Sequence, residues 1–166
     1  IDDLSVKLVP YDSAETSDRF TIRKTFWKEL LSKLSNTNLY SNISPSKANW
    51  LNSGSGISGI PFTMAISSKN ACIQLTIERA SKQENKLIYD RLLENKTQIE
   101  SRFGNKLIWE KLPEKKTSRV RFLINDVNYF NKDDWNKLFE FFTINLPKFE
   151  QAFRPEIEKQ KNIKWD

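Results

Sequence analysis

The sequence contains no histidine, and it has one cysteine, Cys72, among its 166 residues. Without histidine, Ser-His-Asp and Cys-His nucleophiles are excluded, and a lone thiol excludes zinc sites built from cysteine and histidine. A single cysteine cannot form a disulfide within the chain, so nothing indicates an oxidising compartment, and we expect a cytoplasmic location. We therefore predict neither a catalytic residue nor a metal site in this chain.

Long apolar runs are also missing, because no stretch approaches the roughly 18 residues that a membrane span needs. We expect no membrane partner. The start, Ile1-Asp2-Asp3, has neither Met nor the features of a signal peptide, and it indicates a cut end. We interpret residues 1–18 as a linker or joining strand from a missing N-terminal region, residues 19–161 as one domain and residues 162–166 as a frayed tail.

Positive charge is concentrated in one short segment of the chain. Between Lys106 and Arg121 there are six basic and two acidic residues, so this segment carries +4 of the net +6. A local basic patch suits an anionic partner, and a two-stranded ribbon can enter a nucleic-acid groove. We predict nucleic-acid contacts, with DNA favoured over RNA, from five side chains: Lys111, Lys115, Lys116, Arg119 and Arg121. The alternative is a solvated hairpin whose charges serve solubility.

Hydrophobic spacing predicts alternating helical and extended segments. An apolar stripe that begins after Ser17 or Asp18 predicts the first helix, and from Asn49 onward the period changes to two, which predicts three strands. A helix from Ser81 to Phe103, strands near 106–112 and 118–124, and an aromatic helical region from Trp135 follow. Pro147 should kink or divide that last region. The order α-β-β-β-α-β-β-α indicates an α+β fold, an antiparallel sheet of about five strands with helices mainly on one face.

Aromatic residues recur at core spacing. Trp27, Trp50 and Trp135 are expected in the core, as are Trp109 and the phenylalanines from Phe139 to Phe153. A helix face this apolar needs a partner, so a homodimer sealed by the last helix is the alternative.

Three of the four glycines lie in the stretch NWLNSGSGISGIPFTM, where Gly54, Gly56 and Gly59 spell G-x-G-x-x-G. In a phosphate-binding loop this motif opens a helix. Here Ile60-Pro61-Phe62 begins a strand, so we predict a tight strand connection that lies against a neighbouring helix. A pocket formed by Trp50, Gly54, Ser55 and Gly56 is the functional alternative.

Two Glu-x-Lys spacings resemble half of a nuclease motif, at Glu94-Asn95-Lys96 and Glu114-Lys115-Lys116. Neither follows an Asp on a convincing strand, so we predict no intact nuclease site in this chain.

Several of these pieces are shared with one family. They are Phe26-Trp27, Trp50 with Gly54-Ser55-Gly56, Phe103-Gly104, Asp133-Asp134-Trp135, Phe153-Arg154-Pro155 and above all LIWEKLPEKKTSRV from Leu107 to Val120. Together they resemble the bacterial domain of unknown function DUF 4268 over roughly Arg19 to Lys159. Pro147 departs from the family, whose members usually run a helix through this position.

The resemblance implies a context for the chain. In that family the domain often follows a PD-(D/E)XK nuclease-like domain in proteins suspected of DNA restriction or phage defence. It implies a non-catalytic accessory domain that binds or targets nucleic acid, without a cofactor of its own, since Mg²⁺ would belong to the nuclease domain. A ligand-sensing or dimerisation module is the alternative. A divergent enzyme is a third hypothesis, based only on acidic residues that could gather in space.

Overall fold

The computed structural model describes residues 8–163, and the side chains of residues 18–163. Its elements, in chain order, are α1 (Leu8–Lys33), β1 (Trp50–Ser53), β2 (Phe62–Ile66), β3 (Asn70–Ile77), α2 (Lys82–Glu94), α3 (Lys96–Phe103), β4 (Ile108–Glu110), β5 (Ser118–Asn125), a 3₁₀ turn η1 (Lys132–Asp134) and α4 (Trp135–Gln160).

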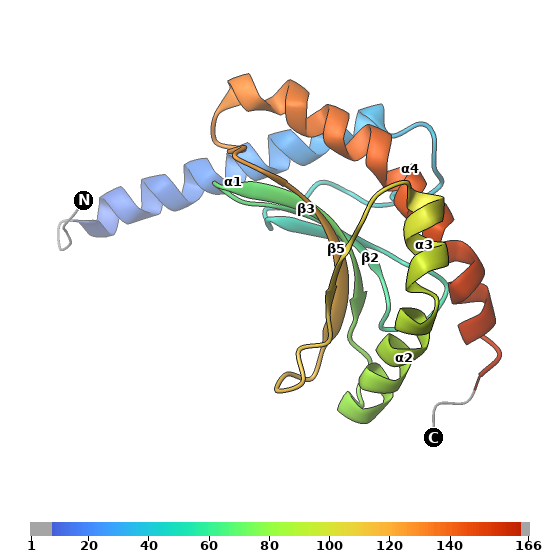
Figure 1. Ribbon diagram of the computed structural model, residues 1–166. Coiled ribbons are helices and arrows are strands. Elements are labelled where there is room, and N and C mark those ends of the chain that lie inside the picture. The colour runs from blue at the N-terminus through green and yellow to red at the C-terminus, as the bar shows by residue number, and fades with distance from the viewer. Residues whose placement is uncertain (1–7, 164–166) are drawn as a thin grey trace.

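The five strands form one antiparallel sheet in the order β1-β2-β3-β5-β4. Period-two alternation gives each strand two faces. Phe62, Leu75 and Val120 stand in register on the face that packs against the helices, and all three are fully buried. Figure 1 shows the helices gathered on that side of the sheet. The predicted α+β class, the antiparallel sheet and the mainly one-sided helix layer are confirmed.

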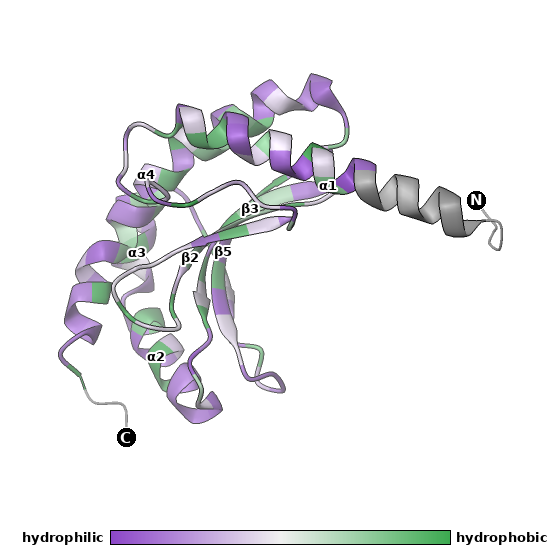
Figure 2. Ribbon diagram, turned by 180° about the vertical axis from the view of Figure 1, so that it is seen from behind, coloured by the Kyte–Doolittle hydropathy of each residue, from purple (hydrophilic) through white to green (hydrophobic). Residues whose placement is uncertain are grey.

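Helix α4 supplies the largest part of the core, as its aromatic spacing predicts. Phe149 is fully buried, and its ring lies 6.2 Å from that of Phe62 in β2 and 5.8 Å from that of Phe103 in α3. Figure 2 shows polar and apolar segments alternating along the helices, as expected for helices with one buried side. The aromatic face that suggested a dimer is therefore occupied within the chain itself.

Helix α1 begins earlier than the sequence predicts. We expected a strand or linker through residue 16, but the helix starts at Leu8 and includes Pro10. That expectation was wrong for residues 8–16, because a proline in the first turn of a helix removes a donor that has no partner there. The rest of the expected linker, residues 1–7, lies outside the described residues. Further along α1, the predicted stripe member Phe20 is only half-buried, while Phe26, Trp27 and Leu30 are fully buried.

The predicted helix from Ser81 to Phe103 is divided into two helices. Ser81 caps α2, since its side chain accepts a hydrogen bond from the Glu84 N–H, and Gly104 ends α3 with a φ of 91°. Both predicted ends are confirmed. Asn95 breaks the run between them, with backbone angles of −108° and 23° that lie outside the helical region.

Pro147 does not divide α4, which continues from Trp135 to Gln160 with two prolines inside it. Figure 1 shows the helix bending along its course. A proline within a helix removes one backbone hydrogen bond, and a bend accommodates the ring.

Candidate functional site: a polar hollow on the open sheet face

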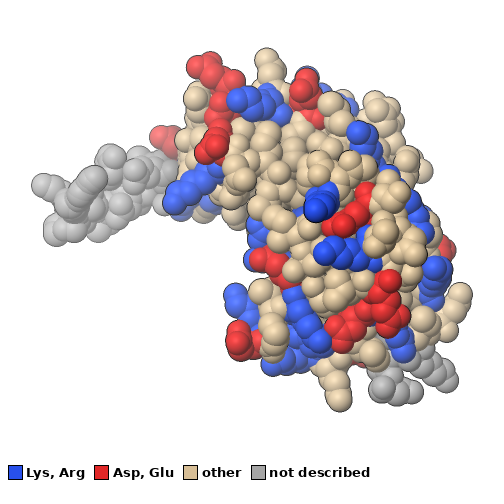
Figure 3. All heavy atoms as spheres, in the orientation of Figure 1, with Lys and Arg blue, Asp and Glu red and all other residues tan. Residues whose placement is uncertain are grey.

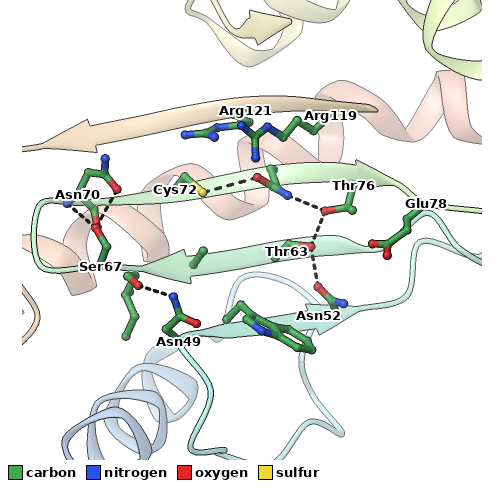
Figure 4. Close-up of a pocket in the computed structure, with 14 residues that line it drawn as sticks. Asn49, Asn52, Thr63, Ser67, Asn70, Cys72, Thr76, Glu78, Arg119 and Arg121 are labelled. Atoms are coloured by element: carbon green, nitrogen blue, oxygen red, sulfur yellow. Dashed lines mark hydrogen bonds between the residues drawn. The ribbon is translucent and has the colours of Figure 1, made fainter. Parts of the chain in front are cut away.

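The sheet face opposite the helices is hollowed and polar. The hollow has a volume of 580 Å³, and residues from β1, β2, β3 and β5 line it. Figure 4 shows its labelled side chains rising from neighbouring strands of the sheet. The volume lies within the range of roughly 300–1,000 Å³ typical of small-ligand sites.

Strand register arranges this face in cross-strand rows. One row runs from Trp50 through Ala65 and Cys72, so small side chains flank an indole that is 50% exposed. The next row holds Asn52, Thr63, Gln74 and Arg121. The hollow therefore has an aromatic, small-residue row beside a row of hydrogen-bonding groups.

Side-chain hydrogen bonds connect the polar residues of this face, and the donor in each bond can be assigned. Thr63 Oγ1 donates to Asn52 Oδ1 at 2.6 Å, and Gln74 Nε2 donates to Thr76 Oγ1 at 2.8 Å. Thr63 and Thr76 lie 2.8 Å apart, oxygen to oxygen. Because a hydroxyl has a single proton and that of Thr63 is used on Asn52, Thr76 must be the donor to Thr63. This direction leaves both N–H groups of Asn52 and one of Gln74 without a partner among the described residues.

Two arginines of β5 add further donors. Arg119 Nε donates to Glu110 Oε1 at 2.7 Å, and Arg121 Nη1 lies 3.6 Å from the same oxygen. One carboxylate thus balances two guanidinium groups. The Arg121 side chain is 18% exposed, and its Nε is buried without a hydrogen-bond partner within residues 18–163. A buried donor of this kind is rare unless another group satisfies it. Around Asn52, Gln74 and these two arginines, the surface therefore offers more donors than acceptors, and Glu78 is the carboxylate at the far end of the hollow.

The floor of the hollow includes the lone cysteine. Burial raises the pKa of the Cys72 thiol, so the group is neutral near pH 7. Its Sγ lies 3.8 Å from Gln74 Oε1. Within the described part of the chain, no three Cys, Asp or Glu side chains come together as metal ligands would.

The structure does not bring the five predicted nucleic-acid residues together. Arg119 and Arg121 line the hollow, whereas Lys111 forms an ion pair with Asp90 of α2, at 2.9 Å from Nζ to Oδ1. Lys115 and Lys116 are exposed on the turn between β4 and β5 and have no ion-pair partner among residues 18–163. In Figure 3, Lys and Arg side chains gather at the lower end of the molecule, around this turn.

Lys86 of α2 holds the turn between β4 and β5 from the helix side of the sheet. Its ammonium lies within hydrogen-bond distance of four acceptors for its three protons: the carbonyl oxygens of Lys111, Leu112 and Thr117 at 2.6–2.8 Å, and the Ser118 hydroxyl at 2.9 Å. Desolvation lowers the pKa of Lys86, and the neighbouring Lys82 and Lys111 lower it further. A half-buried cation of the helix layer thus organises the basic turn.

The pocket predicted from Trp50, Gly54, Ser55 and Gly56 is split between the two sides of the sheet. Trp50 lines the hollow, contrary to the expectation that it lies in the core. Ser55 is buried, and its carbonyl accepts a hydrogen bond from Arg154 Nη1 of α4 at 2.7 Å. The glycine stretch is therefore a connection between β1 and β2 that lies against a helix, as its turn chemistry predicts.

Sequence reasoning missed the amide and hydroxyl members of the site. The period-two pattern identifies the polar positions of β1, β2 and β3. These positions are occupied by Asn52, Thr63, Gln74 and Thr76. The pattern alone could not show that this face is hollowed, since a polar sheet face is ordinarily only solvated.

The fold and the hollow define a class of protein: a small α+β domain with one helix-covered sheet face and one open face rich in hydrogen-bond donors. The chain belongs to the family described as Domain of unknown function (DUF4268), which matches residues 22–157. No curated protein and no solved structure matches the chain. Over the described residues, each helix is too short or too polar to cross a bilayer.

Proposed function

We propose that this chain is a non-catalytic nucleic-acid-binding domain that contacts its ligand through the open sheet face. The observation that carries the proposal is the surplus of donors in the hollow, formed by Arg119, Arg121, Asn52 and Gln74. Phosphate oxygens are acceptors only, and arginine is suited to bind them. Lys115 and Lys116, on the turn that follows β4, add exposed positive charge near the Arg119 end.

The site proposed here differs from a ribbon inserted into a groove. Lys111 is already neutralised by Asp90, so the hairpin does not present five free cations. The two arginines instead project from β5 over the sheet face. DNA is the first probe, with RNA as the comparison.

Fluorescence anisotropy with labelled DNA at several salt concentrations tests the proposal. The double variant Arg119→Gln/Arg121→Gln should bind more weakly, and its salt slope should fall by about 1.4–1.8, or roughly 0.7–0.9 for each lost phosphate contact. The matched control is Lys137→Gln/Lys148→Gln, which removes two exposed positive charges from α4 on the helix side. Both variants lower the net charge from +6 to +4, that is, 6 − 2.

Equal losses in the two double variants would show diffuse attraction and contradict the proposed site. Absence of binding by the unmodified chain to DNA and to RNA at low salt would overturn nucleic-acid binding altogether.

We further propose, from the resemblance alone, that the domain serves a protein with a PD-(D/E)XK nuclease-like domain in DNA restriction or phage defence. An Asp and a Glu-x-Lys motif on neighbouring strands upstream of Ile1 in the gene product would support this context, and their absence would count against it.

The size of the hollow favours one alternative, a small-ligand sensor, because 580 Å³ accommodates a single nucleotide-sized molecule. A mononucleotide that raises the melting temperature, in a chain that binds no oligonucleotide, would favour this function over the first.

A further inference from the structure

We infer that the hollow takes a single-stranded segment, with one unpaired base against Trp50 and its phosphate beside Arg121. This inference rests on the proposed function, and it specifies the form of nucleic acid that the open face binds. The Trp50 indole is 50% exposed, and it stands on the sheet face that lines the hollow.

The row that contains Trp50 provides room for a flat ring. Ala65 and Cys72 stand beside Trp50 on the adjacent strands, and both have small side chains. Larger residues at these two positions would fill the space next to the indole. A base could therefore lie against the indole, an interaction that every base can make and that depends little on sequence.

The neighbouring row supplies partners for the edge of that base. Asn52 keeps two free N–H groups, and Gln74 keeps one N–H and a carbonyl oxygen approached only by the Cys72 thiol within the described residues. Donors and an acceptor in a fixed row match the exposed edge of an unpaired base. In a duplex those edges are paired and both ring faces are already stacked.

Charge places the phosphate at the Arg121 end. Glu78 lies beyond Thr76, on the same side as Arg119, so of the two arginines Arg119 is the less favourable neighbour for the phosphate of the stacked base. Arg121 stands opposite Gln74, farther from Glu78, and its buried Nε has no partner within residues 18–163. The Arg121 side chain remains 18% exposed, and its guanidinium would donate to a phosphate oxygen that approaches from the hollow.

The spacing of the strands sets the scale of the ligand. From β1 to β5 there are three strand spacings, or about 14 Å at roughly 4.8 Å each. This width and the volume of 580 Å³ suit one or two nucleotides of a strand. A duplex presents a broad backbone surface that could not place a base in the hollow.

The test compares a twelve-nucleotide oligothymidine with a twelve-base-pair duplex by anisotropy at fixed low salt. We expect the single strand to bind at least tenfold more tightly. Trp50→Leu should weaken single-strand binding about 5- to 150-fold, the range measured for loss of one stacked base. Trp50→Phe should recover part of the loss, and Ala65→Leu should weaken binding by filling the space beside the indole.

The matched control is Phe130→Leu, which removes another exposed aromatic ring that lies outside the hollow. It should leave affinity unchanged. Circular dichroism and melting temperature identify any variant that fails to fold. Because Trp50 is half exposed, Trp50→Phe should fold even if Trp50→Leu does not, and it then tests the stacking by itself.

Equal or tighter binding of the duplex, or single-strand binding that is unchanged in Trp50→Leu, would overturn this inference. In either case a salt-dependent loss in Arg119→Gln/Arg121→Gln would leave the proposed function standing. Failure of both nucleic acids to bind would overturn the two together.

Discussion

At the scale of single residues, Tyr40 shows how one side chain joins a loop to the sheet. It is almost fully buried, and its hydroxyl lies 3.0 Å from the carbonyl oxygens of both Leu51 in β1 and Phe62 in β2. Its own N–H donates to Ser53 Oγ at 3.1 Å. The position also has a φ of 68°, in the left-handed region. Tyr40 thus fixes the edge of the sheet from which Trp50 projects.

Removing this hydroxyl should destabilise the protein in a pH-dependent way. We expect Tyr40→Phe to lower the free energy of unfolding by about 1–3 kcal/mol at pH 7, the cost of leaving buried acceptors unsatisfied. Burial raises the pKa of Tyr40 well above its ordinary value of 10.0. The folded chain therefore retains the proton after the unfolded chain has lost it, and the stability due to Tyr40 is present below pH 10 and declines as pH rises above it.

Urea denaturation of both proteins between pH 7 and pH 11 measures this difference. The gap between wild type and Tyr40→Phe should narrow above pH 10, while other titrating groups, Tyr89 among them, affect both proteins alike. A gap that stays constant across this range would contradict a buried, hydrogen-bonded phenol.

At the scale of elements, two glycines with positive φ have different surroundings. Gly104 ends α3 with a φ of 91°, and a Cβ added there would meet no atom within 4 Å. Gly59, with a φ of 81°, begins the approach to β2, where a Cβ would lie 3.0 Å from Arg79 Cα and 3.1 Å from the Glu78 carbonyl oxygen. Only the second position is crowded by backbone.

Gly59→Ala should therefore cost more stability than Gly104→Ala. For Gly104→Ala we expect about 1–2 kcal/mol, the cost of the left-handed conformation alone. For Gly59→Ala the contact with fixed backbone adds about 1–3 kcal/mol. Chemical denaturation of the two variants measures the difference, and equal losses would show that the Glu78–Arg79 backbone moves aside freely.

Elements also show what could be predicted from sequence and what could not. The alternation at Phe62, Met64 and Ile66, and the cap at Ser81, act locally, so the strand faces and the start of α2 follow from the chain alone. Trp50 could not be placed, because its exposure depends on which sheet face the helices cover. The sequence also could not show that Lys111 is ion-paired and so separated from the other basic residues of the hairpin, since its partner Asp90 is 21 residues away in the sequence.

At the scale of the whole molecule, a single apolar core joins the helices to the sheet. Phe26 of α1 stacks on Phe139 of α4 with ring centroids 5.1 Å apart, and Phe149 connects α4 to β2 and α3. The core continues through the buried faces of β2, β3 and β5 without a break. The open face is therefore supported from behind by one packed unit, and a rigid support is what a preformed hollow requires.

A continuous core predicts one cooperative unfolding transition. Far-ultraviolet circular dichroism and tryptophan fluorescence should give the same midpoint, because domains of this size usually unfold without populated intermediates. Phe26→Ala and Phe149→Ala, at two ends of the core, should each cost about 3–5 kcal/mol. At roughly 2–4 °C per kcal/mol, each should lower the melting temperature by about 6–20 °C with the two probes still coincident. If the two probes gave different midpoints for Phe26→Ala but the same midpoint for Phe149→Ala, α1 would be a unit that unfolds by itself. The support behind the hollow would then come from the sheet, α2, α3 and α4 alone.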